Sequence, residues 1–351
     1  MIGSKPLQFC PDFPALAQRW EAWWAFRSTR PLLIASVSAR SDIRHDKAFD
    51  LLEDPSAWLA VRRRQLEATR FSEDTPPNLR VDLGPVAPAA YLGAPLHFAP
   101  QENTSWQTPI IEEWDDLAAA HLDPQNRWLQ ATLALMSACA RDAAGRYLVC
   151  LPDFSGAFDI LANLRGTERL LMDLYDHPDA VRRAADRAVD AWEQVFATSY
   201  ETILGEGAGV NSWVQVWSDR PYTIPTCDFN FMIGPDVFRD LVMPSLAEQS
   251  RRAGRCLFHL DGPGAARHAE TLAEEPAITA VQFTPGAGTP SALARLDMFR
   301  MLQDSRKPLA LVCPAEEVAE LAEKLDPRGL ALMPEGIRSP EHLQELQRQV
   351  V

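Results

Sequence analysis

Eight short apolar runs, each followed by a helical pattern, are the feature of this 351-residue sequence that most constrains its fold. Each run has the length of a strand, and the segments between them place apolar residues three and four positions apart, as amphipathic helices do. Strands that alternate with helices pair in parallel, and eight such units predict a TIM (β/α)8 barrel in the α/β class. The eight runs are residues 31–37, 79–83, 147–151, 210–217, 256–260, 278–283, 308–313 and 329–333.

The helical segments suggest a single domain over residues 1–351, with residues 1–30 as an N-terminal helical extension. A Trp-rich amphipathic stretch, 13–26, lies in that extension, and 93–123 is expected to be an elaborated loop after the second strand. A doubly wound dinucleotide-binding sheet needs G-x-G-x-x-G after its first strand, and none follows Val37. The predicted helices are 55–70, 124–144, 178–204, 235–253, 265–274, 291–303, 315–324 and 340–350.

Charge and hydropathy argue against a nucleic-acid-binding protein and against a membrane-spanning one. The formal net charge is −14 and the only basic run is 62–64, so nucleic acid is not an expected partner. No stretch approaches the roughly 18 apolar residues of a membrane span, and residues 1–13 do not resemble a signal peptide. The expectation is a cytoplasmic protein with no membrane partner, whose six scattered cysteines are free thiols.

Chemistry in a TIM barrel gathers at the carboxyl ends of the strands. Asp82, Asp153, Gln282 and Glu335 stand at such ends, and three tryptophans are candidates for apolar walls of a small-molecule site, namely Trp106, Trp213 and Trp217. Each has a structural alternative. Asp153 would also serve as a helix N-cap, and Asp82 would organise the turn before Gly84-Pro85.

The segment His259-Leu260-Asp261-Gly262-Pro263-Gly264 carries the strongest signal for chemistry. Residues i and i+2 of a strand lie on the same face, so His259 and Asp261 are predicted to share one side if the strand extends that far. Glycines permit close backbone approach to a ligand, although Asp-Gly-Pro-Gly is also ordinary turn chemistry. His259, Asp261 and Asp153 are therefore the candidate catalytic residues.

Three stretches resemble the uroporphyrinogen decarboxylase-like superfamily. They are 153–178, which contains Asp-Phe-Ser-Gly and Leu-Arg-Gly-Thr-Glu; 227–244, which contains Cys-Asp-Phe and Ile-Gly-Pro-Asp-Val-Phe; and 259–286, which contains His-Leu-Asp-Gly-Pro-Gly and Val-Gln-Phe-Thr-Pro-Gly. True uroporphyrinogen decarboxylases carry an arginine-rich signature near R-Q-A-G-R, and nothing like it surrounds residues 27–40. The resemblance is therefore to a methyltransferase-like subgroup and not to a true uroporphyrinogen decarboxylase.

The methyltransferase branch of that superfamily binds zinc through H-x-C and a later cysteine. Here the first pair is His259-x-Asp261, and the later position reads Met333-Pro334-Glu335. Neither cysteine ligand is present in this sequence. If a metal is bound, its expected ligands are His259, Asp261 and Glu335, which are harder and richer in oxygen than the zinc–thiolate set. The cofactor is left open between a divalent metal such as zinc and a corrinoid carried by a partner.

The resemblance implies a methyltransferase linked to a corrinoid protein, with a small-molecule substrate and a homodimer as further expected partners. Two alternatives stay open: a lyase that decarboxylates a small carboxylic acid, and a non-catalytic barrel that binds a tetrapyrrole or corrinoid. A lyase needs a cationic group, for which Arg40, Arg165 and Arg220 are candidates. The expected substrate-binding residues are Asp82, Trp106, Trp213, Trp217, Asp228 and Gln282.

Overall fold

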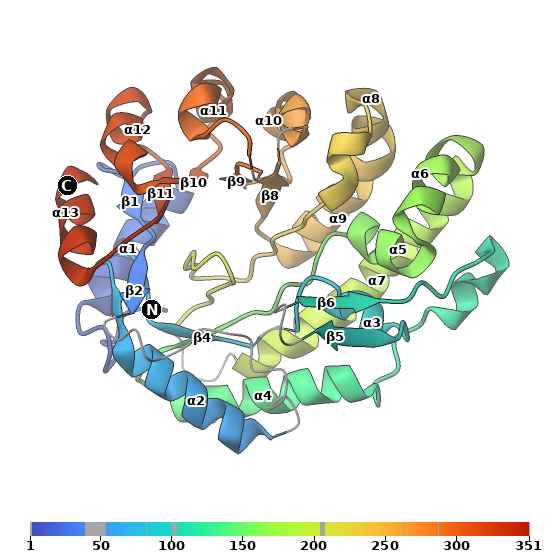
Figure 1. Cartoon of the computed structure of the whole chain (residues 1–351), viewed down its shortest axis with the longest axis horizontal. Coiled ribbons are helices and arrows are strands. Elements are labelled where there is room, and N and C mark those ends of the chain that lie inside the picture. Colours follow the sequence, from blue (N-terminus) through green and yellow to red (C-terminus); the bar gives the residue numbers. More distant parts are fainter. Residues whose placement is uncertain are drawn as a thin grey trace.

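The computed structural model describes residues 2–38, 54–81, 83–99, 104–203, 208–262, 264–286 and 288–350. Helices lie around the outside of the molecule and the parallel strands face its interior (Figure 1). No helix in these ranges combines the length and the apolar character that crossing a membrane requires. All six cysteines are free, which confirms the sequence prediction.

The central sheet consists of five parallel strands in the order β1-β11-β10-β9-β8. Leu332 of β11 pairs with Leu33 of β1 on one side and with Leu311 of β10 on the other, so the last strand lies beside the first. Each of the predicted strands 256–260, 278–283, 308–313 and 329–333 is confirmed within a few residues. The bounds are β1 (Leu32–Leu33), β8 (Leu257–Asp261), β9 (Ala280–Thr284), β10 (Leu309–Pro314) and β11 (Leu330–Glu335).

Two further predicted strands form a separate parallel pair, β4 (Asn78–Arg80) with β7 (Leu148–Cys150). The predicted strand 210–217 is wrong. Val210 and Ser218 exchange backbone hydrogen bonds of 2.8 and 2.9 Å, and Gln215 adopts φ 61°, so the chain turns back on itself. Isolated parallel bridges join this segment to β7 at Asn211 and to β8 at Thr223.

These strands do not form a closed ring within the described residues. The segment 208–227 lies between β7 and β8. Leu151 N donates to Asn211 O at 2.9 Å on one side, and on the other Leu257 N donates to Thr223 O at 2.9 Å and His259 N to Pro225 O at 3.1 Å, but the segment contains no assigned strand. The fold is therefore a mixed α/β domain around a parallel sheet, and the predicted closed eight-stranded barrel is only partly reproduced.

The predicted helices are present, and the N-terminal stretch forms α1 (Phe13–Trp24). The helices on the outside are α2 (Pro55–Ala68), α4 (Arg127–Ala143), α7 (Pro178–Ile203), α8 (Pro235–Val237), η5 (Phe238–Val242), α9 (Met243–Ala253), η6 (Ala265–His268), α10 (Ala269–Glu274), η7 (Ala292–Arg295), α11 (Leu296–Asp304), η8 (Ala315–Glu317), α12 (Val318–Lys324) and α13 (Pro340–Val350).

Several elements were not anticipated. An antiparallel pair, β5 (Leu96–Ala99) and β6 (Thr104–Gln107), together with η3 (Trp114–Ala119), occupies the predicted loop 93–123. Two helices that were not predicted from the sequence follow β7. The predicted strand 31–37 is divided into β1 and β2 (Ser36–Ser38), and β2 pairs antiparallel with an unanticipated strand, β3 (Thr69–Phe71). The remaining unanticipated elements are α3 (Ala87–Tyr91), α5 (Ala157–Arg165), α6 (Thr167–Asp176) and η4 (Asp228–Met232).

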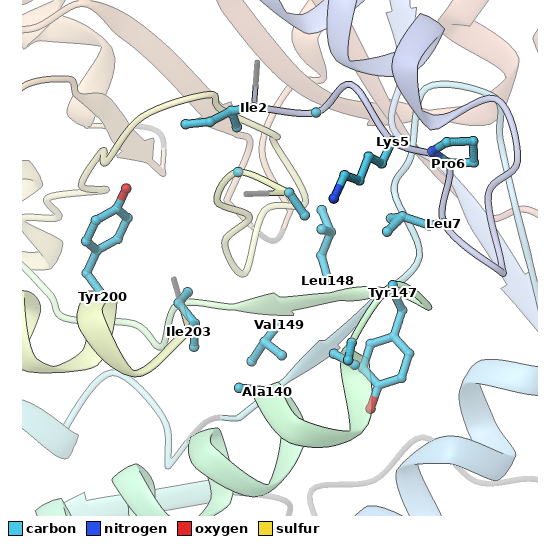
Figure 2. Close-up of a pocket in the computed structure, with 16 residues that line it drawn as sticks. Ile2, Lys5, Pro6, Leu7, Ala140, Tyr147, Leu148, Val149, Tyr200 and Ile203 are labelled. Carbon is cyan, nitrogen blue, oxygen red and sulfur yellow. The ribbon is translucent and has the colours of Figure 1, made fainter. Parts of the chain in front are cut away.

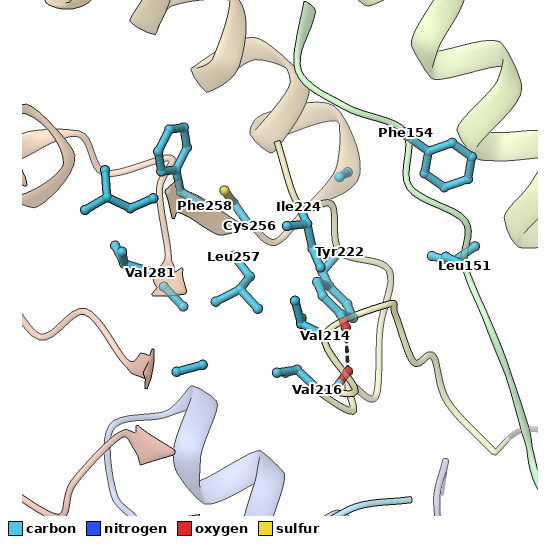
Figure 3. Packing of buried hydrophobic residues seen from close by; sticks show 14 of the residues in the cluster. Leu151, Phe154, Val214, Val216, Tyr222, Ile224, Cys256, Leu257, Phe258 and Val281 are labelled. Atoms are coloured by element: carbon cyan, nitrogen blue, oxygen red, sulfur yellow. Dashed lines mark hydrogen bonds between the residues drawn. The ribbon is translucent and has the colours of Figure 1, made fainter. Parts of the chain in front are cut away.

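The core joins the sheet to the irregular segment 208–227. Figure 3 shows Val214, Val216 and Tyr222 of that segment packed beside Leu257 of β8. The Tyr222 hydroxyl donates to the backbone oxygen of Val216, which satisfies a phenol that is buried completely. Apolar contacts therefore hold the segment in place together with its few backbone hydrogen bonds to β8.

One buried carboxylate fastens α1 to the start of the sheet. Asp74 is fully buried and accepts hydrogen bonds from Arg19 Nε at 2.6 Å, Arg30 Nη1 at 2.8 Å and the backbone nitrogen of Leu33 at 3.0 Å. Its backbone oxygen accepts from Trp20 Nε1 at 2.8 Å. A buried charge with several charge-assisted partners is costly to disrupt, because the groups left behind lose their compensation.

We expect Asp74→Asn to lower the free energy of unfolding by about 3 kcal/mol, since both guanidinium groups lose their buried counter-charge. Glu73→Gln is the matched control. Glu73 also pairs with Arg30, but its side chain is 42% exposed, so its loss should cost less than about 1 kcal/mol. Urea unfolding of both variants measures the difference, and equal losses would contradict the role of Asp74.

Candidate active site

His259 and Asp261 lie at the carboxyl end of β8, which extends to Asp261. The two side chains are two residues apart on one strand and therefore share a face, as the sequence predicted. His259 is half-buried and Asp261 is exposed. The following turn also has a packing role, because a Cβ on Gly264 would lie 2.5 Å from Cβ of Phe231.

Gln282 of β9 stands directly opposite His259 in the sheet register. Its side-chain oxygen makes a short hydrogen bond to His259 Nδ1, and its Nε2 donates to Thr284 Oγ1 at 2.9 Å. With the amide in this orientation, the neutral form of the ring carries its proton on Nδ1 and has a lone pair on Nε2. Gln282 is buried, so the imidazole is held by a fixed partner.

Trp213 supplies an aromatic wall beside this histidine. The two rings meet edge to face, with centroids 5.0 Å apart. The guanidinium carbon of Arg80, the last residue of β4, lies 5.6 Å from the Trp213 ring centroid, within the range of a cation–π contact. Residues from β4, β8, β9 and the 208–227 segment therefore converge on His259.

A pair of carboxylates lies beneath the same cluster. Asp159 of α5 is buried; its Oδ1 accepts from the backbone nitrogen of Asp228 at 2.8 Å, and its Oδ2 accepts from the Thr226 hydroxyl. Burial, followed by the neighbouring charge of Asp228, raises the pKa of Asp159 well above its usual range, and the two hydrogen bonds offset only part of this.

Asp228 links this pair to the histidine. Surrounding protein raises the pKa of Asp228; the charge of His259 lowers it and that of Asp261 raises it. Its side chain is nevertheless exposed to solvent, so it lies in a recessed but reachable position, and the upward shift is moderated by screening. Asp228, His259 and Asp261 therefore act on one another electrostatically.

Asp153, which follows the end of β7, is a third carboxylate beside Asp159 and Asp228. It is buried, its carboxylate accepts from the backbone nitrogen of Ser155 at 2.9 Å, and its charge contributes to the raised pKa of Asp159. The N-cap of α5 is Gly156, so the alternative in which Asp153 caps that helix is wrong. Six predicted residues thus come together: Asp153, Trp213, Asp228, His259, Asp261 and Gln282.

Other predicted site residues lie elsewhere. Trp217 is fully buried against α1, with its ring edge toward Phe13 at 5.9 Å and its Nε1 donating to the Ala208 oxygen. Trp106 is half-exposed on β6, where it stacks on His97. Asp82 and Arg40 lie outside the described residues.

The remaining candidate cations are engaged in ion pairs. Arg165 is buried with Asp173 at 2.8 Å, a structural pair, and Arg220 contacts Asp219 at 3.2 Å near the surface. Neither has a contact with the His259 cluster.

The donor set does not fit the zinc–thiolate site that the resemblance implies. Within the part of the chain that the structure describes, no three His, Cys, Asp or Glu side chains are grouped closely enough to hold a metal ion, and this includes His259, Asp261 and Glu335. Cys227 is close enough to Asp159 and Asp228 to be affected by their charges. Burial, and then these charges, raise its pKa and keep the thiol protonated.

Comparison with solved structures finds a methyltransferase from Methanosarcina mazei with a TM-score of 0.64. The alignment covers 95% of this chain and 97% of that one, at 14% sequence identity. No protein-family model matches the chain, and no curated protein is detectably similar in sequence. At this identity the likeness shows a shared fold over almost the whole chain.

Three residues of the cluster were not predicted from the sequence: Arg80, Asp159 and Thr226. Asp159 was detectable, because it is an aspartate within the otherwise apolar run Ala157-Phe-Asp-Ile-Leu-Ala162, the composition of a buried helix face. Arg80 and Thr226 carry no such local signal, since an arginine at a strand end and a threonine in a loop are both common surface residues.

The raised pKa of Asp159 means that the folded protein binds a proton more tightly than the unfolded chain. Its contribution to stability therefore falls as pH rises from the unfolded value toward the folded one. We expect Asp159→Asn to gain stability relative to the wild type between about pH 5 and pH 8. Unfolding at both pH values, with exposed Asp304→Asn as the control for net charge, measures this; a difference independent of pH would refute it.

Proposed function

We propose that this protein is an enzyme that transfers a methyl group to a small acceptor at the His259 cluster. The single observation that carries the proposal is the imidazole fixed by Gln282, with Nε2 left as a base beside Trp213. The fold shared with a methyltransferase supports it. The proposal includes a (β/α)8 barrel in which the 208–227 segment takes the place of one strand.

In the proposed transfer, His259 takes the proton that the acceptor loses. An acceptor X–H would approach His259, its proton would pass to Nε2, and the electron pair of the broken X–H bond would form the new X–CH3 bond as the methyl group leaves its donor. Asp261 and Asp228 stabilise the imidazolium that results. A corrinoid carried by a partner protein is the proposed methyl donor; it would keep the electron pair of its bond to the departing methyl group, while the residues of this chain would only hold the acceptor and take its proton.

A decarboxylating lyase is the second candidate, and one contact favours it. Arg80 lies over Trp213, beside His259, and so places a cation where a substrate carboxylate would bind. Arg80 was not among the cations predicted from the sequence for this role. His259 would then protonate the carbanion equivalent left when CO2 departs.

Methylcobalamin, a free corrinoid with a transferable methyl group, tests the first candidate. The purified protein should demethylate it in the presence of small thiol or amine acceptors, followed by its visible spectrum and by mass spectrometry of the product. Release of CO2 from small carboxylic acids without demethylation would favour the lyase. Ligand uptake with no turnover at all would favour the non-catalytic binder and contradict both.

We expect His259→Ala to lower kcat/KM by about 100-fold or more, which is the scale of lost general acid–base help, and Asp261→Asn to do likewise. His97→Ala is the matched control, because that half-buried histidine stacks on Trp106 and lies far from His259 in the sequence. If His259→Ala and Asp261→Asn leave both turnover and ligand binding unchanged, the reaction takes place elsewhere.

Gln282→Glu tests how the imidazole is positioned. A carboxylate against Nδ1 favours the protonated ring, so the acidic limb of the pH–rate profile should move up by about one pH unit, with the rate at high pH largely kept. Gln344→Glu, an exposed change of equal charge on α13, should leave the profile in place. An unshifted profile in Gln282→Glu would contradict the positioning role.

A further inference from the structure

A second cavity lies at the opposite end of β7 from the candidate active site. Leu148 and Val149, at the start of β7, line it, whereas Asp153 follows the end of that strand. The N-terminal segment, α4 and the end of α7 form the other walls (Figure 2). None of the residues assigned to the His259 cluster contributes to it.

The cavity has a volume of about 120 Å3 and a mostly apolar lining. Leu7, Leu148, Val149 and Ile203 supply the apolar surface, and Ala140 contributes only a methyl group. A dry, apolar cavity of about 150 Å3 is large enough to hold benzene, so this one suits a ring or a short branched alkyl group.

Two polar groups stand at the boundary of this apolar space. Figure 2 shows the Lys5 side chain reaching over Leu148, with Tyr200 on the other side of the cavity. Within the residues that the structure describes, neither the Lys5 ammonium nor the Tyr200 hydroxyl has a hydrogen-bond or ion-pair partner. Burial raises the pKa of Tyr200, so its hydroxyl remains a neutral donor.

We propose that this cavity is a binding site for a small monocarboxylate whose apolar body is about the size of a benzene ring. The apolar walls take the body of the ligand. The Lys5 ammonium binds the carboxylate by charge, and Tyr200 forms part of the opposite wall. The site is separate from the proposed methyl transfer and does not depend on it.

A single segment of the chain connects this cavity to the candidate active site. Gly209 lines it, and Trp213, four residues later, packs on His259. Gly209 has φ 87°, and a Cβ there would lie 2.6 Å from Nε1 of Trp217. A ligand would therefore press on a segment that is already closely packed and leads directly to the catalytic histidine.

Sodium benzoate is the probe, with binding measured by isothermal titration calorimetry on the full-length protein. We expect a Kd of about 1 mM or tighter, the affinity range of such a small ligand. Benzylamine, with the same ring and the opposite charge, should not bind. Absence of benzoate binding at about 10 mM would overturn the proposal.

Two variants separate the contribution of the Lys5 charge from that of the apolar cavity. Lys5→Met should weaken benzoate binding about 10-fold or more, because a charged hydrogen bond is lost, whereas the control Lys324→Met, which removes an exposed lysine paired with Glu320, should not. Ala140→Leu should fill the space and abolish binding.

If Ala140→Leu fails to fold, Lys5→Met decides the matter alone, because Lys5 is exposed and its loss is tolerable for stability. Benzoate binding that is unchanged in Lys5→Met would overturn the assignment of a carboxylate ligand. Binding that is unchanged in a folded Ala140→Leu would overturn the assignment of this cavity.

Discussion

The buried carboxylate of Asp74 is the interaction on which the N-terminal part of the structure depends. It holds Arg19 of α1 and Arg30, and it accepts from the backbone of Leu33, so one side chain fixes a helix and the first strand together. β1 has only two residues and pairs with β11 alone among the described strands. A ladder this short has little stability of its own, and the side-chain network supplies what the backbone pairing lacks.

The candidate active site is assembled in a different way, from strand ends and from one irregular segment. β8 and β9 place His259 opposite Gln282 by register alone, which is why those two residues are fixed most firmly. Trp213 comes from the 208–227 segment, which turns back on itself instead of forming a strand. His259 and Gln282 are therefore held by the sheet, whereas Trp213 is held by side-chain packing. Active sites commonly combine residues on scaffold strands with residues on loops in this way.

Much of the fold follows from periodicity. The alternation of apolar runs and helical patterns located β8 to β11 and the outer helices, because strand and helix spacings differ clearly in those stretches. The run 210–217 was wrongly predicted as a strand for a physical reason: its valines and Trp217 are buried as in a strand, but Gln215 adopts a left-handed conformation that no periodicity reveals. The helix α5 was missed because a strongly apolar stretch has no clear polar face.

The site was predictable where residues share one element or one register. His259 and Asp261 follow from their spacing, and Gln282 from its place at a neighbouring strand end. Arg80, Asp159 and Thr226 meet this cluster only through tertiary packing between segments about 70 to 180 residues apart, and a single sequence carries no record of such contacts. Trp217 shows the converse, since this tryptophan, predicted at a strand end to line the site, packs in the core.

The pairing of Leu33 with Leu332 has a consequence for biosynthesis. Translation proceeds at about 5 to 20 residues per second, so the partner of the first strand leaves the ribosome roughly 15 to 60 seconds after that strand does. During this interval Leu32 and Leu33 have no sheet to join. Contacts made early, between Asp74 and the arginines some 45 to 55 positions before it, are the ones available to shelter them. The nascent chain is thus most vulnerable to aggregation and to chaperone capture until its final strand emerges.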